Sequence, residues 1–234
     1  MAEEWKVLDL SSKSFDEFVV FFFDRTVVPD GQIFSHFHAD ADGRQYDDVA
    51  HSSPEVVVRH MTGLFSHFGE IAPRYSLAQV DQAIWGIFTS FSLDGLLFDT
   101  SLLLPDRLEC IRSMYRVFAD FVTQSKEGEW GGFWMWWDFI LHDFWLPPRP
   151  RLPGTRRGDP EKLDAESRIL LDAIFETLTR ILELPDKHAQ RSALHGLGHL
   201  HHPAVHETVQ RYIDTHQSGF DLAWLEQCRD GNVL

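Results

Sequence analysis

Five histidines are concentrated near the C-terminal end of the chain, between positions 195 and 206. His195 and His199 are four residues apart, so on a helix they share one face, and two imidazoles in this arrangement reach one zinc or iron ion. His202 and His206 would approach from the following turn and the next helix. The sequence therefore offers a metal site at His195, His199 and either His202 or His206, with carboxylates from the N-terminal half as further ligands.

The same histidines have a simpler interpretation. Gly196 stands where the His-Glu-x-x-His motif of metalloproteases has its general base, so that motif is absent. Histidines near the C-terminus of a helix place a cation at the negative end of the helix dipole. We favour this second interpretation, in which the histidines are surface or capping groups and no cofactor is expected.

An aromatic segment over residues 131–145 carries a polar pair at helical spacing. The segment is apolar on nearly every face, and Asp138 and His142 lie four residues apart within it. A helix with so little polar surface is usually enclosed by its neighbours. Pockets for small molecules also combine aromatic walls with a few polar groups. The sequence favours a core helix and leaves open a ligand pocket that contains Asp138 and His142.

Acidic side chains dominate the charge of the protein, with 36 acidic residues against 21 basic ones and a formal net charge of −15. A nucleic-acid backbone must meet clustered Lys and Arg, so this charge argues against nucleic acid and favours a basic protein partner. A polar segment at about residues 27–52 reads as an acidic loop. We expect its aspartates to contact that partner: Asp40, Asp42, Asp47 and Asp48.

Cysteine content and the N-terminal residues indicate a cytoplasmic protein. Cys110 and Cys228 are too few and too far apart for a disulfide framework or a four-cysteine zinc site. The first residues carry two acids where a secretory signal has basic residues. The longest uninterrupted apolar run, Phe18 to Phe23, is far shorter than the roughly 20 residues that cross a bilayer. We therefore expect no membrane association.

Helix signals recur along the chain, and no segment alternates with the period of a strand. Ser14 and Ser76 each begin a capping box, in which a hydroxyl and a side chain three residues later satisfy free backbone N–H groups. Pro54 and Pro105 mark first turns of helices, with Ser53 as the cap before Pro54. Apolar residues follow each signal at spacings of three and four. The sequence predicts an all-α fold, an irregular helical bundle or short α-solenoid with about eight to ten helices.

A connection rich in proline and arginine, residues 147–160, is the best internal boundary. Its five prolines forbid a regular helix and favour extended chain. It divides an N-terminal helical region, 1–146, from a C-terminal one, 161–234. We expect Asp159 to cap the next helix, with Pro160 at its first position, and we expect both regions to pack as one unit.

One segment, about residues 187–216, resembles a single HEAT-like repeat unit. In that family an Arg and small residues pack the first helix closely, a Gly-Leu-Gly-x-Leu run leads to a turn with a proline, and a second helix follows. The matching residues are Arg191, Ala193, Leu194, Gly196, Leu197, Gly198, Leu200, Pro203, Val205 and Val209. The resemblance implies a helical scaffold that binds proteins.

Three functions are consistent with the sequence. We favour a non-enzymatic binding module whose acidic surface holds a basic protein partner, with an immunity-type inhibitor of a toxic enzyme as the most concrete form, because charge complementarity speeds association. One alternative is a metal-dependent enzyme that uses the histidine cluster. The other is a small-molecule binder built around the tryptophan-rich helix.

Overall fold

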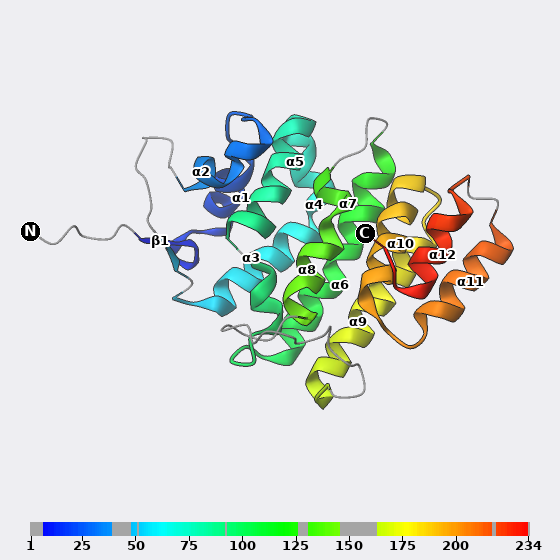
Figure 1. Ribbon diagram of the computed structural model, residues 1–234. Helices are drawn as coiled ribbons and strands as arrows, with labels where there is room; N and C mark the ends of the chain where they lie inside the picture. Colours follow the sequence, from blue (N-terminus) through cyan, green and yellow to red (C-terminus); the bar gives the residue numbers. More distant parts are fainter. Residues whose placement is uncertain are drawn as a thin grey trace, which may run out of the picture.

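The protein is built almost entirely of helices, as the sequence predicts (Figure 1). The computed structural model describes residues 7–38, 48–50, 52–91, 93–125, 131–145, 163–216 and 219–233, with the backbone alone for 48–50 and 142–145. These residues contain nine α-helices of nine residues or more. No helix among them is both long enough and apolar enough to cross a bilayer.

The helices follow one another along the chain with a single small sheet near the start. The α-helices are α1 (Phe15–Phe23), α2 (Ile33–Phe37), α3 (Pro54–Ser66), α4 (Phe68–Ile71), α5 (Leu77–Trp85), α6 (Leu104–Asp120), α7 (Gly131–Trp134), α8 (Trp136–Trp145), α9 (Ala165–Leu182), α10 (Lys187–Leu200), α11 (Val205–Thr215) and α12 (Leu222–Asp230). Strands β1 (Val7–Asp9) and β2 (Asp48–Ala50) pair in parallel. The expected loop at 27–52 therefore contains both α2 and β2, which alternation alone did not reveal because each is so short.

The predicted start signals lie at the beginnings of α1, α3, α5 and α6. At Ser14 the backbone N–H donates to Glu17 at 2.8 Å, and the hydroxyl accepts from the backbone N–H of Glu17. Ser76 forms the same box with Gln79. Pro54 does begin α3, but the side chain of Ser53 makes no capping hydrogen bond and turns to Glu55 instead. Ser53 is therefore the N-cap residue of α3, as predicted, but its side chain does not satisfy the free N–H groups of the first turn.

The two regions on either side of the proline-rich connection share one hydrophobic core. Helix α6 packs against both α3 and α9, and α10 packs against α8. Arg107 of α6 is buried and forms an ion pair with Glu166 at the start of α9. Residues 151–162 lie outside the described chain, including the expected cap Asp159; the described helix α9 begins after Asp164, whose carboxylate accepts from the backbone N–H of Ser167 at 2.7 Å.

The aromatic segment forms two helices, α7 and α8, with a break at Met135. Trp136 and Trp137 at the start of α8 are fully buried, and Ile140 and Leu141 continue the same buried surface. The preference for a core helix is thus correct for these side chains. Trp134 and Asp138 are only partly buried, so the segment also presents a face that is not core.

Helix α10 lies directly against α8 because Gly196 has no side chain. A Cβ atom at this position would lie 2.7 Å from Cβ and Cγ of Trp137 and 2.8 Å from Leu178. Real Cβ atoms do not approach other atoms so closely, so any larger residue must separate the helices or displace the Trp137 indole. This contact determines the distance between the facing side chains of α8 and α10.

Substitution of Gly196 tests this contact. Gly196→Ala improves helix propensity by about 1 kcal/mol, yet we expect it to lower the free energy of unfolding by about 1–3 kcal/mol, because overpacking outweighs propensity. Urea unfolding followed by circular dichroism measures the change. Gly31→Ala is the control, since a Cβ at Gly31 meets nothing within 4 Å. A Gly196→Ala variant as stable as the wild type would contradict the close-packing argument.

Candidate metal centre

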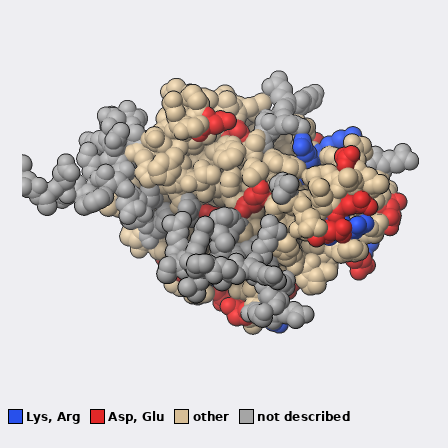
Figure 2. All heavy atoms as spheres, viewed as in Figure 1, with Lys and Arg blue, Asp and Glu red and all other residues tan. Residues whose placement is uncertain are grey.

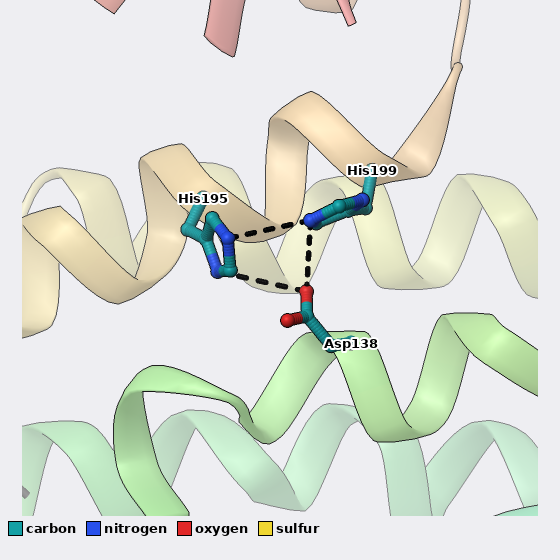
Figure 3. Close-up of side chains that lie close together, drawn as sticks. All are labelled: Asp138, His195 and His199. Atoms are coloured by element: carbon teal, nitrogen blue, oxygen red, sulfur yellow. Dashed lines mark hydrogen bonds and ion pairs between the residues drawn. The ribbon is translucent and has the colours of Figure 1, made fainter. Parts of the chain in front are cut away.

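Three metal-binding side chains converge where α8 meets α10 (Figure 3). Asp138 comes from α8, and His195 and His199 come from successive turns of α10. Each offers a ligand atom, and the three atoms lie within 4.8 Å of one another. Among the described residues, no other group of three or more histidine, cysteine or acidic side chains meets this condition.

The spacing of these atoms matches that of ligands around one ion. Nε2 of His199 lies 3.0 Å from Oδ1 of Asp138 and 3.3 Å from Nε2 of His195. Two atoms that each lie about 2.1 Å from one ion are about 3.0 Å apart at a right angle and about 3.4 Å apart at the tetrahedral angle. Nδ1 of His195 is also 3.5 Å from Asp138; only one of its two nitrogens can bind the same ion.

Burial makes the carboxylate of Asp138 electrostatically unfavourable without a cation. The side chain of Asp138 is 18% exposed, that of His199 is 20% exposed and that of His195 is 1% exposed. Oδ1 of Asp138 is buried and accepts no hydrogen bond of good geometry within the described residues. Loss of hydration therefore raises the pKa of Asp138 to about 7. A bound proton or a bound metal cation would each relieve this cost.

Aromatic stacking orients His195. The Trp134 indole lies nearly parallel to the imidazole, with ring centroids 4.1 Å apart. The guanidinium of Arg191, one turn earlier on α10, lies 4.3 Å from the Trp134 ring. Ser192 donates a 2.8 Å hydrogen bond to the carbonyl oxygen of Phe133, which fixes α7 to α10. Groups that surround metal ligands in this way hold each ring in position for the metal.

The other two predicted histidine ligands lie outside this centre. His202 is occupied on both nitrogens: Nδ1 accepts from the backbone N–H of Ala204 at 3.1 Å, and Nε2 lies 3.1 Å from Asp172. His206 is 68% exposed, and its Nε2 lies 3.9 Å from Asp230. The structure thus brings together two of the four predicted histidines. The carboxylate that joins them, Asp138, comes from the N-terminal helical region but not from the N-terminal half of the chain, where further ligands were expected.

The predicted pair of Asp138 and His142 is only partly described. Both belong to α8, but the side chain of His142 lies outside the described residues. Asp138 turns out to face α10. The sequence held a signal for this contact: Trp134 and Asp138 are spaced by four, as are Arg191, His195 and His199. Side chains in two such rows can pack against each other, although the spacing alone does not show that the two helices are neighbours.

The predicted partner-binding aspartates remain a prediction. Asp40, Asp42 and Asp47 lie outside the described residues, and for Asp48 only the backbone, in β2, is described.

Comparison with known proteins gives no relative from which a function could be transferred. The chain matches no protein-family model, no curated protein and no solved structure. The likeness of residues 187–216 to a HEAT-like unit therefore stays a prediction, although two helices, α10 and α11, do form there.

The raised pKa of Asp138 predicts a pH-dependent stability for the metal-free protein. A carboxyl group with a higher pKa in the folded state holds its proton more tightly there than in the unfolded state. Its contribution to the stability of the fold is therefore fully present below pH 3.8 and is lost as the pH rises to about 7. Relative to Asp138→Asn, we expect the free energy of unfolding of the wild type to fall by about 1–3 kcal/mol between pH 5 and pH 8. Urea unfolding in the presence of EDTA measures this difference.

Asp164 provides a control of opposite sign. Hydrogen bonds from Ser167 lower its pKa, so its contribution is present above the unfolded pKa and is lost as the pH falls. Relative to Asp164→Asn, wild type should therefore gain stability as the pH rises. A constant difference between wild type and Asp138→Asn would show that Asp138 is not desolvated.

Proposed function

We propose that this protein binds one divalent transition-metal ion, zinc or iron(II), through Asp138, His195 and His199, and acts as a metal-dependent enzyme. The observation that carries this proposal is the convergence of three ligand atoms within 4.8 Å, with two of their separations, 3.0 Å and 3.3 Å, at the values expected around a single ion. The buried Oδ1 atom of Asp138 supports it, because two imidazoles and no permanent cation lie beside this carboxylate among the described residues.

The donor set favours a borderline metal. Two imidazoles with one carboxylate suit zinc, and the same set with open coordination positions is typical of non-haem iron(II). Calcium and magnesium prefer sites built from oxygen atoms alone. The choice between zinc and iron(II) depends on coordination number, so both are tested below.

A set of three protein ligands among the described residues favours a catalytic role over a structural one. Structural zinc sites are closed by four protein ligands, whereas catalytic sites keep one position for water or substrate. Asp138 and His199 are each about one-fifth exposed, so solvent reaches the ligands from one side. A bound metal ion there would lower the pKa of a coordinated water and supply a nucleophile near neutral pH.

Metal titration of histidine variants tests the ligand set. Protein stripped with EDTA is titrated with Zn²⁺, and with Fe²⁺ without oxygen, and the bound ions are counted by native mass spectrometry. We expect one ion per wild-type chain. The double variant His195→Ala, His199→Ala should bind at least about 100-fold more weakly, because loss of a mere outer-shell partner already costs about 10–100-fold.

Two matched variants separate this ligand set from the one that the sequence suggested. His202→Ala and His206→Ala each remove an imidazole next to the same helix, and we expect both to keep one ion with nearly unchanged affinity. If either variant loses as much metal affinity as the double variant, the proposed ligand set is wrong. A wild-type chain that binds neither metal would refute the proposal.

We also propose, as a second function, that an acidic surface of the protein binds a basic protein partner, in the manner of an immunity-type inhibitor. The net charge of −15 favours it. Figure 2 shows acidic side chains, with basic ones among them, at the end of the molecule formed by the last helices. Glu207, Asp214, Glu226 and Asp230 are exposed on α11 and α12. Binding of this kind requires no metal.

Neutralising the four predicted aspartates tests this second proposal. A basic protein that co-purifies from the natural source at low salt is identified first, and its association rate is measured by stopped flow. We expect the fourfold variant D40N, D42N, D47N, D48N to associate at least about 10-fold more slowly and with a weaker salt dependence.

A variant with the same change in net charge elsewhere is the control. Glu70, Glu109, Glu176 and Glu183 are exposed on other elements, and their replacement by Gln should change the rate far less. Unchanged association of the aspartate variant at low salt would exclude the predicted acidic loop as the contact surface.

A further inference from the structure

Helix α12 touches the surroundings of the candidate metal centre through a chain of stacked rings. The Trp224 ring of α12 lies 5.8 Å from that of Trp134, with the planes inclined by 34°. Trp134 in turn stacks on His195 at 4.1 Å. A displacement of α12 therefore removes packing from the very indole that holds one of the proposed ligands.

The end of α12 also lies directly on the backbone of α10, one residue before His199. A Cβ at Gly198 would lie 2.7 Å from Cγ2 of Val233 and 3.2 Å from Cα of Cys228. Gly231, in the left-handed conformation with φ +71°, ends α12 close to His201 at the end of α10. Since no side chain separates them here, α10 and the end of α12 cannot shift independently.

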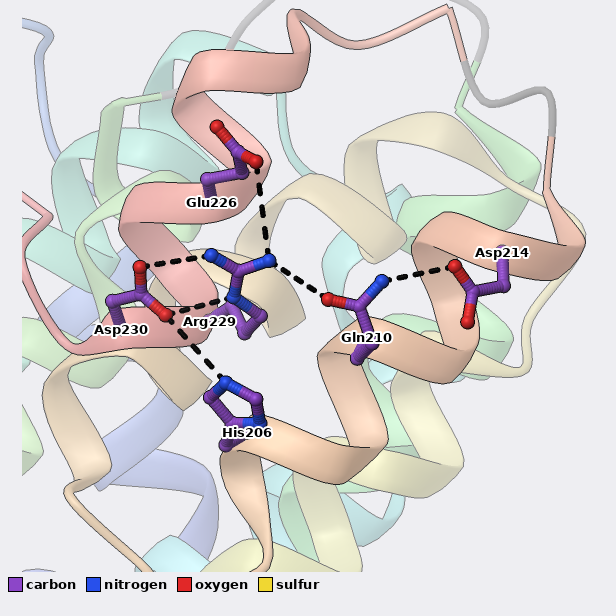
Figure 4. A network of polar contacts seen from close by, with 6 residues as sticks. All are labelled: His206, Gln210, Asp214, Glu226, Arg229 and Asp230. Carbon is purple, nitrogen blue, oxygen red and sulfur yellow. Dashed lines mark hydrogen bonds and ion pairs between the residues drawn. The ribbon is translucent and has the colours of Figure 1, made fainter.

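Helix α12 packs against α11 as well as against α10. Arg229 of α12 donates to Gln210 of α11 at 2.8 Å and pairs with Asp230 at 2.7 Å and Glu226 at 3.9 Å (Figure 4). These groups lie at the surface, where ion pairs contribute little. A nine-residue helix is also too short to be stable alone. The position of α12 thus depends on its packing against α10, α11 and Trp134.

We propose that metal binding at Asp138, His195 and His199 controls the docking of α12. This inference rests on the proposed metal centre and adds a regulatory role to it. An ion that joins α8 to α10 orders the end of α10 and His195, which holds the Trp134 indole by stacking. Helix α12 packs on that indole and on the end of α10. Because α12 carries part of the exposed acidic surface, metal occupancy would set how well that surface is ordered.

Hydrogen exchange of the full-length chain tests the coupling. Amide exchange of residues 222–230 is followed by mass spectrometry after EDTA treatment and again with saturating Zn²⁺. We expect exchange in α12 to slow by at least about 5-fold, within the range of about 5–150-fold that coupled sites show. The variant Trp224→Leu should reduce this slowing, and by reciprocity it should weaken Zn²⁺ binding. Leu222→Ala, on the exposed side of the same helix, should change neither.

The possible results separate this inference from the metal proposal. If one Zn²⁺ binds and slows exchange in α10 but not in α12, the coupling is refuted and the metal centre stands. If no Zn²⁺ binds, both fail. If Zn²⁺ slows exchange of α12 equally in the His195→Ala, His199→Ala variant, the ion acts from another site and the inference is overturned.

Discussion

Helix α10 has no side chain at Gly196, so the Trp137 side chain of α8 packs directly against the α10 backbone there. This close approach determines the geometry of the candidate site. Asp138 follows Trp137 in α8, and His195 precedes Gly196 in α10, so the contact that buries the indole also turns the carboxylate toward the imidazoles. A wider separation of the helices would leave each of the three side chains in its own solvated position.

The same contact removes a carboxylate from water without placing a permanent cation beside it. Arg107 is buried still more deeply, but it meets Glu166, so its charge is compensated where it leaves water. Asp138 has two imidazoles and no permanent cation beside it among the described residues, and burial raises its pKa. Burying an uncompensated carboxylate is costly, and a core with no use for it would hold an apolar residue there. A bound proton or a bound cation would each offset this cost.

Local patterns predicted these helices well because each capping box and each apolar spacing involves only residues that are close in the sequence. The boxes at Ser14 and Ser76 and the apolar spacing after Pro54 involve residues within one or two turns. The break at Met135 and the strand at Asp48–Ala50 escaped prediction, since tertiary contacts rather than local preference decide such short elements. His195 and His199 were predictable as a pair for the same reason: one helix sets their spacing.

Asp138 could not be assigned to these histidines from the sequence, because the proline-rich connection lies between them and no local rule gives the orientation of α8 against α10. Gly196 and Gly198 have a different role in the structure from the one that the HEAT-like pattern suggested. Gly196 and Gly198 belong to the HEAT-like pattern, which concerns packing between helices of a repeat. In the structure, α8 packs against the backbone of α10 at Gly196, and the end of α12 packs against it at Gly198. Helix α10 therefore lies between α8 and the end of α12, and each of these two neighbours packs against its backbone at a glycine.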